Sequence, residues 1–221
     1  MSGPRGCFVT ATDTGVGKTI LCAALVASLR AAGEPVRARK PVLTGLDEDG
    51  PADHELLASV SGERPEEVAP LRYGPAVSPH LAAALERRPI DVAGLAALID
   101  GPGPVIVEGI GGLLVPLASG WDVRALAREL GLGVLVAARP GLGTINHTLL
   151  TLEAARAGGL DIRAVVLTPW PAQPTVLERS NRETIETLGG VEVATLPTVA
   201  PLTPAALAAA GDALHYERWL A

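Results

Sequence analysis

The sequence predicts an α/β fold, a doubly wound and mostly parallel sheet with helices on both faces. The first observation is a series of short, continuous apolar runs, which is the pattern of strands buried on both sides. The second is that helix-like segments separate these runs, and strands that alternate with helices form parallel sheets. The expected strands are Cys7–Ala11, Val36–Val42, Pro104–Val107, Val134–Ala138, Ala164–Thr168 and Val191–Leu196.

The predicted helices lie between the predicted strands. Asp122 stands directly before one of them, where its side chain would cap the helix. The acidic, glycine-rich stretch Leu46–Pro51 is predicted to be a mobile surface loop. A chain of 221 residues, 48% of them apolar, fits one large domain over residues 1–221 better than two small ones. The expected helices are Lys18–Arg30, Ala52–Val60, Val92–Ile99, Val123–Leu130, Asn146–Ala157, Val176–Leu188 and Pro204–His215.

Charge and composition exclude several classes of protein. The net charge is −6 and the charges are scattered, whereas a general nucleic-acid binder would need a basic stripe. The apolar runs are too short for a transmembrane helix, and the first residues lack the apolar core of a secretion signal. Cys7 and Cys22 lie in apolar segments without a metal-ligand spacing, as expected of buried cysteines in a reducing compartment. We therefore expect a cytoplasmic protein that binds neither nucleic acid nor membranes.

The two lysines of this chain indicate sites that require lysine. Of the 18 basic residues, 16 are arginines and only Lys18 and Lys40 are lysines. Arginine does not replace lysine where a compact charge must sit close to phosphate oxygens. The alternative is that one of the two lysines persists by chance.

The segment Gly15-Val16-Gly17-Lys18-Thr19-Ile20 follows a predicted strand and a threonine-rich turn, and it opens a predicted helix. This is the context of a P-loop. The glycines let the backbone approach phosphate oxygens closely, Lys18 supplies a cation, and Thr19 supplies a hydroxyl for Mg²⁺. A chance turn before a helix is the alternative. The sequence thus predicts a nucleotide-binding fold of the P-loop NTPase type.

The glycine pattern of this loop distinguishes between P-loop families. Chromosome-partitioning ATPases carry a second lysine five residues before the invariant one, and here that position is Asp13. The stretch from Ala11 to Thr19 instead resembles the loop of dethiobiotin synthetases, written G-T-D-T-x-V-G-K-T, with Ala11 in place of the first glycine. Five further segments resemble that family in the same order: the Lys40 segment RKPVLTG, Asp53, Ser78–His80, VEGIGG from Val107, which contains Glu108, and LGTINH from Leu142.

The resemblance implies an ATP-dependent ligase of biotin synthesis. It implies closure of a cyclic urea from 7,8-diaminopelargonate and CO₂ (or bicarbonate), with ADP and phosphate as the other products. An amine of the substrate takes up CO₂ as a carbamate, the γ-phosphate converts it into a carbamic-phosphoric anhydride, and the second amine closes the ring. The family also implies a homodimer whose active site spans the subunit interface.

The resemblance assigns roles that suit the chemistry of these residues. Phosphoryl transfer depends on positioning and charge stabilisation, so two lysines and a metal ion are expected. Lys18 would hold the β- and γ-phosphates, and Lys40 would contact the carbamate and the γ-phosphate. Mg²⁺ prefers oxygen ligands. The family pattern assigns the metal to Thr19, Asp53 and Glu108, further nucleotide contacts to Gly111, and the carbamate or diamine to Thr14 and Thr44.

The two acidic residues differ in how well a structural alternative explains them. Asp53 also suits the cap or first turn of the helix that follows it. Glu108 comes directly after a buried apolar run, where an acid without a partner is costly, so a metal or phosphate site is favoured there.

The turn before the helix at Asn146 has two interpretations. Free N–H groups at a helix start form an anion site, and the family uses Gly143, Thr144 and Asn146 to hold the distal carboxylate of the substrate bound to the partner subunit. The alternative is an ordinary helix start with Asn146 or Thr144 as the cap.

Base recognition departs from the family pattern. Many members carry Asn-Asp where this chain has Thr168-Pro169, and a hydroxyl does not reproduce the paired donor and acceptor of a carboxamide. Nucleoside triphosphates other than ATP are therefore expected to serve as well, with Pro197 packing against the base. Ile110 replaces the usual alanine of the Glu108 motif.

Two rival functions use similar loops. Cobyrinate-amidating enzymes carry a glutaminase domain with a reactive cysteine, for which 221 residues leave no room. A partner-binding ATPase of the partitioning type needs the lysine that Asp13 replaces.

Overall fold

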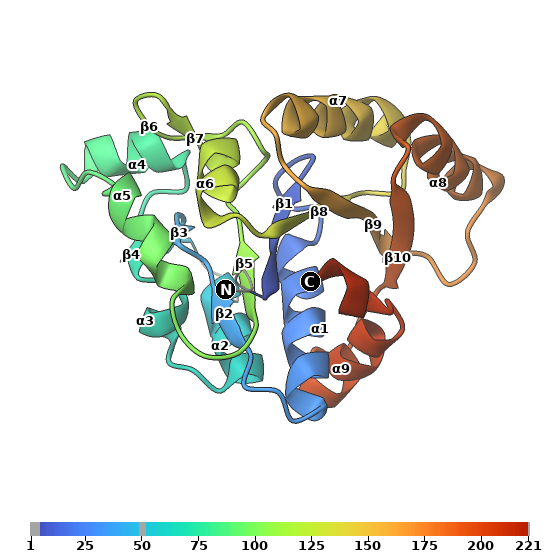
Figure 1. Cartoon of the computed structure of the whole chain (residues 1–221), viewed down its shortest axis with the longest axis horizontal. Helices are drawn as coiled ribbons and strands as arrows, with labels where there is room; N and C mark the ends of the chain where they lie inside the picture. The colour runs from blue at the N-terminus through green and yellow to red at the C-terminus, as the bar shows by residue number, and fades with distance from the viewer. Residues whose placement is uncertain (1–4, 49–51, 221) are drawn as a thin grey trace.

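The centre of the protein is a six-stranded parallel sheet in the order β10-β9-β8-β1-β5-β2 (Figure 1). It is seen in a computed structural model that describes residues 5–48 and 52–220. Every neighbouring pair of strands runs parallel, which confirms the doubly wound sheet. The strands are β1 (Gly6–Ala11), β2 (Arg37–Arg39), β5 (Val105–Glu108), β8 (Gly133–Ala138), β9 (Ile162–Trp170) and β10 (Glu192–Pro197).

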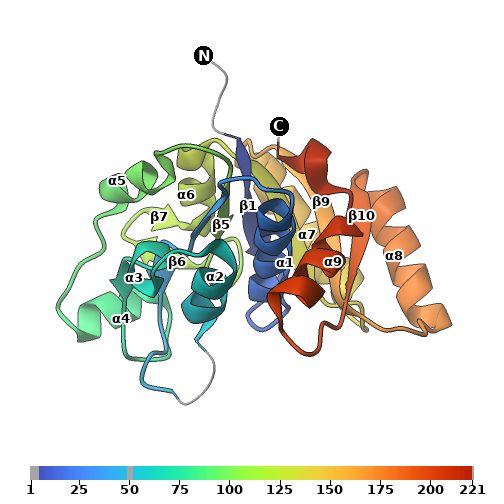
Figure 2. The same ribbon diagram turned by 90° about the horizontal axis from the view of Figure 1, so that it is seen from below.

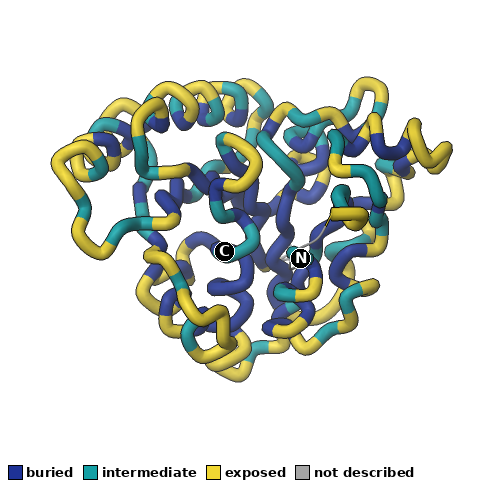
Figure 3. The backbone as a smooth tube through the Cα atoms, turned by 180° about the vertical axis from the view of Figure 1, so that it is seen from behind, coloured by how far each residue is buried: buried dark blue, intermediate teal, exposed yellow. Residues whose placement is uncertain are grey.

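Helices cover both faces of this sheet (Figures 1 and 2). On one face lie α1 (Lys18–Ala31), α2 (Asp53–Ser61) and α9 (Pro204–Asp212). The opposite face is covered by α6 (Val123–Leu130), α7 (Thr144–Ala157) and α8 (Val176–Gly189). Side chains of β1 alternate between the two cores: Val9 packs toward α1, and Phe8 packs toward α6. Figure 3 shows the result, with buried strands inside and exposed residues on the outer turns.

The predicted strand Val36–Val42 is wrong as one element. The chain forms β2 up to Arg39 and then leaves the main sheet, and β3 (Val42–Leu43) pairs instead with β4 (Leu71–Arg72). The break occurs because the N–H of Lys40 donates to the carbonyl of Val68 at 2.8 Å, and because the following proline has no N–H for a ladder. The consequence is that the Lys40 side chain turns into the space beyond the carboxyl edge of the sheet.

The other predicted elements are found with small shifts, and Asp122 caps α6 by accepting from the N–H of Ala125 at 2.7 Å. The predicted helix Val92–Ile99 divides into α5 (Val92–Leu95) and the 3₁₀ turn η1 (Ala96–Ile99). The predicted loop Leu46–Pro51 falls partly outside the described residues. Elements that were not predicted are short: α3 (Pro65–Val68), α4 (Pro79–Leu85), the hairpin of β6 (Pro116–Ala118) and β7 (Trp121–Asp122), and η2 (Tyr216–Trp219).

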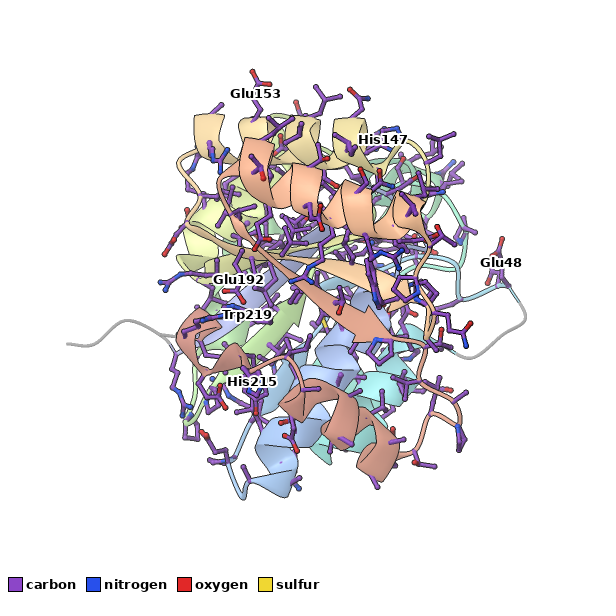
Figure 4. All side chains as sticks on the ribbon, turned by 90° about the vertical axis from the view of Figure 1, so that its right-hand side faces the viewer. Glu48, His147, Glu153, Glu192, His215 and Trp219 are labelled. Atoms are coloured by element: carbon purple, nitrogen blue, oxygen red, sulfur yellow. The ribbon has the colours of Figure 1, made fainter. Side chains whose placement is uncertain are left out.

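The end of the described chain closes the amino edge of the sheet. The N–H of Gly6 donates to the carbonyl of Leu220 at 3.0 Å, so the two ends of the fold are joined. Trp219 is buried and its indole N–H donates to Glu192 at 3.2 Å. Figure 4 labels both residues. Among the described helices, none is long and apolar enough to cross a membrane.

Candidate active site

Most of the predicted site residues converge on one cavity of about 1160 Å³ at the carboxyl edge of the sheet. This is the edge where ligands bind in doubly wound folds, because the loops after parallel strands meet there. Its lining includes these predicted residues: Thr14, Gly15, Gly17, Lys18, Thr19, Ile20, Lys40, Thr44, Asp53, Glu108 and Gly111.

The phosphate loop connects β1 to α1 across one end of this cavity. Gly15 and Gly17 have φ angles of 71° and 96°, which side-chain-bearing residues rarely adopt. Gly17 is the N-cap of α1 and no side chain caps the helix, so the first N–H groups remain available to an anion. Val16 lies in the core beneath the loop and does not line the cavity.

Lys18 is buried at the start of α1. Its ammonium donates to the carbonyl of Asp13 at 3.1 Å, and burial lowers its pKa. A cation that is short of hydrogen-bond partners in a cavity gains from an anionic ligand. Lys18 therefore suits a phosphate group.

Lys40 is 4% exposed and stands between two acids. Its ammonium donates to Glu108 Oε1 at 2.8 Å and forms an ion pair with Asp53. Burial opposes its charge, but the two carboxylates outweigh burial and raise the pKa of Lys40. Lys40 is thus held as a cation at the centre of the cavity.

Glu108 is the most deeply buried acid of the site, at 1% exposed at the end of β5. Its Oε1 accepts from Lys40 and, at 2.9 Å, from the hydroxyl of Thr19. Its Oε2 is buried with no hydrogen-bond partner. Because buried carboxylate oxygens rarely go unpartnered, this atom indicates a place for a ligand.

Asp53 is the first residue of α2 and is not its cap. The cap position is held by Ala52, whose side chain makes no capping bond, so the cap interpretation is wrong and the first-turn interpretation holds. Burial opposes its charge as well, but Lys40 prevails and lowers the pKa of Asp53. Its place in the first turn of α2 is compatible with a functional role, since Asp53 also lines the cavity.

The three residues that the sequence predicts as Mg²⁺ ligands lie in the same cavity. Thr19, Asp53 and Glu108 all line the cavity, and the unpartnered Oε2 of Glu108 fits a hard cation that prefers oxygen. Within the described residues no group of three His, Cys, Asp or Glu side chains has metal-binding geometry. A metal at this place would therefore rely on the hydroxyl and on phosphate oxygens besides the two carboxylates.

Thr14, Thr44 and less polar residues also line the cavity. Sequence reasoning had not assigned the apolar wall, which includes Val77, Ile110 and Val115. Gly111 has a φ of 60°, and a Cβ at that position would lie 2.8 Å from the side chain of Val115. Glycine is thus required for the tight packing of this wall.

The turn before α7 does not line the cavity of the same chain. The N-cap is Gly143, with a φ of 91°, and neither Thr144 nor Asn146 caps the helix as one interpretation had it. Thr144 is buried and its hydroxyl lies 3.4 Å from that of Thr148. Asn146 and the neighbouring His147 are exposed, and Figure 4 labels His147 on the outer side of α7.

Thr168 and Pro197 also lie outside the cavity lining. Thr168 is 2% exposed, and its methyl group packs against the phosphate loop, 2.8 Å from where a Cβ of Gly17 would be. Pro197 is exposed at the end of β10. Leu202, from the loop after β10, does line the cavity, and sequence reasoning missed it. No local pattern marks Leu202, because its position depends on where that loop folds back.

Comparison with known proteins identifies relatives of this chain that are similar over most of its length. A family model described as an AAA domain matches residues 5–206. The ATP-dependent dethiobiotin synthetase BioD of Mycobacterium avium is 45% identical over 209 residues, which cover 91% of this chain and 89% of the relative. The protein of the same name from Haloferax mediterranei is 40% identical over 200 residues, which cover 89% of this chain and 85% of the relative.

Solved structures show the same fold at lower similarity. The cell division ATPase MinD of Pyrococcus furiosus has a TM-score of 0.58 at 18% identity, over 96% of this chain and 98% of that one. Chloroplast FtsY from Physcomitrella patens has a TM-score of 0.52 at 15% identity, and the match covers 96% of this chain and 66% of FtsY. These likenesses show the fold alone. The sequence relatives show more: this chain belongs to the family of ATP-dependent dethiobiotin synthetases.

Proposed function

We propose that the protein closes 7,8-diaminopelargonate and CO₂ to dethiobiotin at the expense of ATP. The observation that carries this proposal is the buried Lys40, held between two carboxylates beside a phosphate loop. Such a cation suits two anions that must react with each other, a carbamate and a γ-phosphate. The names of the relatives support the same reaction.

The proposed sequence of steps uses both lysines. One amine nitrogen of the substrate bonds to the carbon of CO₂ and loses a proton, giving a carbamate. A carbamate oxygen then attacks the γ-phosphorus, and ADP leaves. The second amine attacks the carbonyl carbon of this anhydride and loses a proton, and inorganic phosphate leaves as the ring closes. Lys18 would hold the β- and γ-phosphates, and Lys40 would reduce the repulsion between the carbamate and the γ-phosphate.

Mg²⁺ is proposed to bind to Thr19, Asp53 and Glu108. Bound there, the ion would neutralise charge on the phosphate oxygens. Asp53 and Glu108 now pair with Lys40, so nucleotide and metal binding would redistribute these contacts.

The diamine is proposed to lie against Thr14 and Thr44, which line the same cavity as Lys40. Its distal carboxylate would be held by the partner subunit through Gly143, Thr144 and Asn146 in a homodimer. The support is that this helix start has no side-chain cap, which leaves its N–H groups for an anion. The single domain over residues 1–221 and the cytoplasmic location remain predictions; two free, buried cysteines support the latter.

The first test measures phosphate release from Mg-ATP with and without 7,8-diaminopelargonate and bicarbonate. We expect release to depend strongly on the diamine and to cease when EDTA removes the metal. Duplex DNA and lipid vesicles serve as controls, because a partner-binding ATPase with the MinD fold would respond to those instead. Phosphate release that does not depend on the diamine would rule out the synthetase reaction.

A second test concerns the nucleotide base. Thr168 packs against the phosphate loop and has no carboxamide, so little base discrimination is expected. We expect kcat/KM for GTP and CTP to lie within about tenfold of the value for ATP. The reason is that one base-specific hydrogen bond contributes about tenfold to discrimination between bases, and Thr168 does not supply it. A preference for ATP of about a thousandfold would show that other residues read the base.

A further inference from the structure

An ion pair joins the phosphate loop to the turn that follows the neighbouring strand β8. Arg139 comes directly after β8, and its guanidinium donates to Asp13 Oδ2 at 2.8 Å. Both side chains are about half exposed, at 49% and 52%. Arg139 has no part in the mechanism derived above.

Asp13 is held at three points. Its Oδ2 accepts from Arg139, its Oδ1 accepts from the N–H of Thr14 at 2.7 Å, and its main-chain carbonyl accepts from Lys18 at 3.1 Å. The carboxylate thus fixes the peptide that leads to Thr14, and it lies beside the position where the phosphates are proposed to bind. The negative charge of Asp13 would repel the phosphates of a nucleotide, so a neighbouring cation is needed to neutralise it.

The turn that carries Arg139 is itself anchored. Asn181 of α8 is buried, and its amide donates to the carbonyls of Pro140 at 2.8 Å and Gly141 at 3.2 Å. On the other side, the N–H of Thr12 donates to the carbonyl of Ala137 at 3.0 Å. Arg139 therefore reaches the phosphate loop from a fixed backbone.

We propose that Arg139 is a positioning residue that acts through Asp13 to hold the phosphate loop ready for nucleotide and substrate. It orients the Asp13 carboxylate so that Thr14 keeps its place in the cavity, and it cancels a negative charge that would repel the nucleotide. The part about the diamine rests on the proposed function. The part about nucleotide binding stands without it.

The test compares Arg139→Gln with the wild type. Its readouts are the Kd for Mg-ADP, measured by calorimetry without diamine, and the KM for the diamine at saturating ATP. We expect both to rise about tenfold, the size of effect expected when a charge-assisted hydrogen bond is lost, while kcat changes less than threefold. We expect Arg139→Lys to restore both values to within about threefold, because it keeps the cation.

The double variant separates action through Asp13 from direct contact with phosphate. We expect Asp13→Asn/Arg139→Gln to match Asp13→Asn alone, since Arg139 has no further role once the carboxylate is gone. A double variant that binds Mg-ADP more weakly than Asp13→Asn would overturn the proposal, as would an Arg139→Gln protein with wild-type Kd.

Arg5→Gln is the matched control. Arg5 pairs with Glu34 at the opposite end of β1 and is 51% exposed, close to the value for Arg139. We expect its Kd, KM and Tm to equal those of the wild type. We also expect an unchanged Tm for Arg139→Gln, since exposed ion pairs contribute little to global stability. If the wild type shows no diamine-dependent turnover, the proposed function fails, and the Kd comparison still decides the role of Arg139.

Discussion

The two ends of helix α1 both bury polar side chains, and they differ in how completely these are satisfied. At the C-terminal end, Ser28 donates to Asp212 and its hydroxyl lies 2.7 Å from that of Tyr216. All three groups have partners. At the N-terminal end, Thr19, Lys40 and Glu108 form a network that leaves Glu108 Oε2 without one.

The difference separates a structural network from a binding site. A satisfied network, here formed by the buried Ser28 and Tyr216 with the exposed Asp212, specifies how α1 packs on α9 and needs nothing further. A buried carboxylate oxygen without a partner costs stability in the free protein, and such a cost is retained where a ligand removes it. Changes at the two ends of α1 should therefore separate activity from stability.

The largest effect is expected for Lys40→Met. Loss of the cation should lower kcat by about 100- to 1000-fold, the range seen when one charge-stabilising donor is removed. It should also lower the free energy of unfolding by about 3 kcal/mol, because the buried Glu108 loses its counter-charge. Phosphate release and urea unfolding measure the two effects.

The double variant Lys40→Met/Glu108→Gln provides the control for that prediction. Removing both charges should restore much of the lost stability without restoring activity. If the double variant is as unstable as Lys40→Met, packing rather than charge holds this end of α1 together.

A smaller effect is expected for Glu108→Gln alone. Asp53 still pairs with Lys40, and the amide oxygen still accepts from Thr19, so stability should change by less than about 1 kcal/mol. Because the proposed metal ligand loses its charge, kcat should fall by about a hundredfold and the Mg²⁺ concentration for half-maximal rate should rise. A magnesium titration of activity checks this, and an unchanged titration curve argues against Glu108 as a ligand.

The smallest effect is expected at the other end of the helix. Tyr216→Phe removes one hydrogen bond to the buried Ser28 and should lower the free energy of unfolding by about 1 kcal/mol. Both kcat and KM should stay within twofold of wild type, since the change lies a helix length away from the cavity. A clear loss of activity here would erase the distinction between the two ends.

Much of the site could be predicted from local patterns. The strand–loop–helix at Lys18 is a local motif. Lys40 can be singled out because it is one of only two lysines among 18 basic residues. Glu108 can be singled out because an acid follows a buried apolar run there. Other features depend on contacts between distant parts of the chain. The end of β2 before Pro41 depends on a hydrogen bond from Lys40 to the distant carbonyl of Val68. The buried position of Thr168 depends on its packing against Gly17 of the phosphate loop.

The sequence by itself determined the parallel sheet, the order of strands and helices along the chain, and most of the polar side chains at the carboxyl edge of the sheet, because apolar periodicity and loop motifs are local. Tertiary structure alone decided the pairing inside the site. Lys40 and Glu108 are 68 residues apart, and Thr19 and Glu108 are 89 apart. They meet because β5 inserts between β1 and β2. Glu108 Oε2 has no hydrogen-bond partner because of that strand order and of the path that the chain takes after each strand.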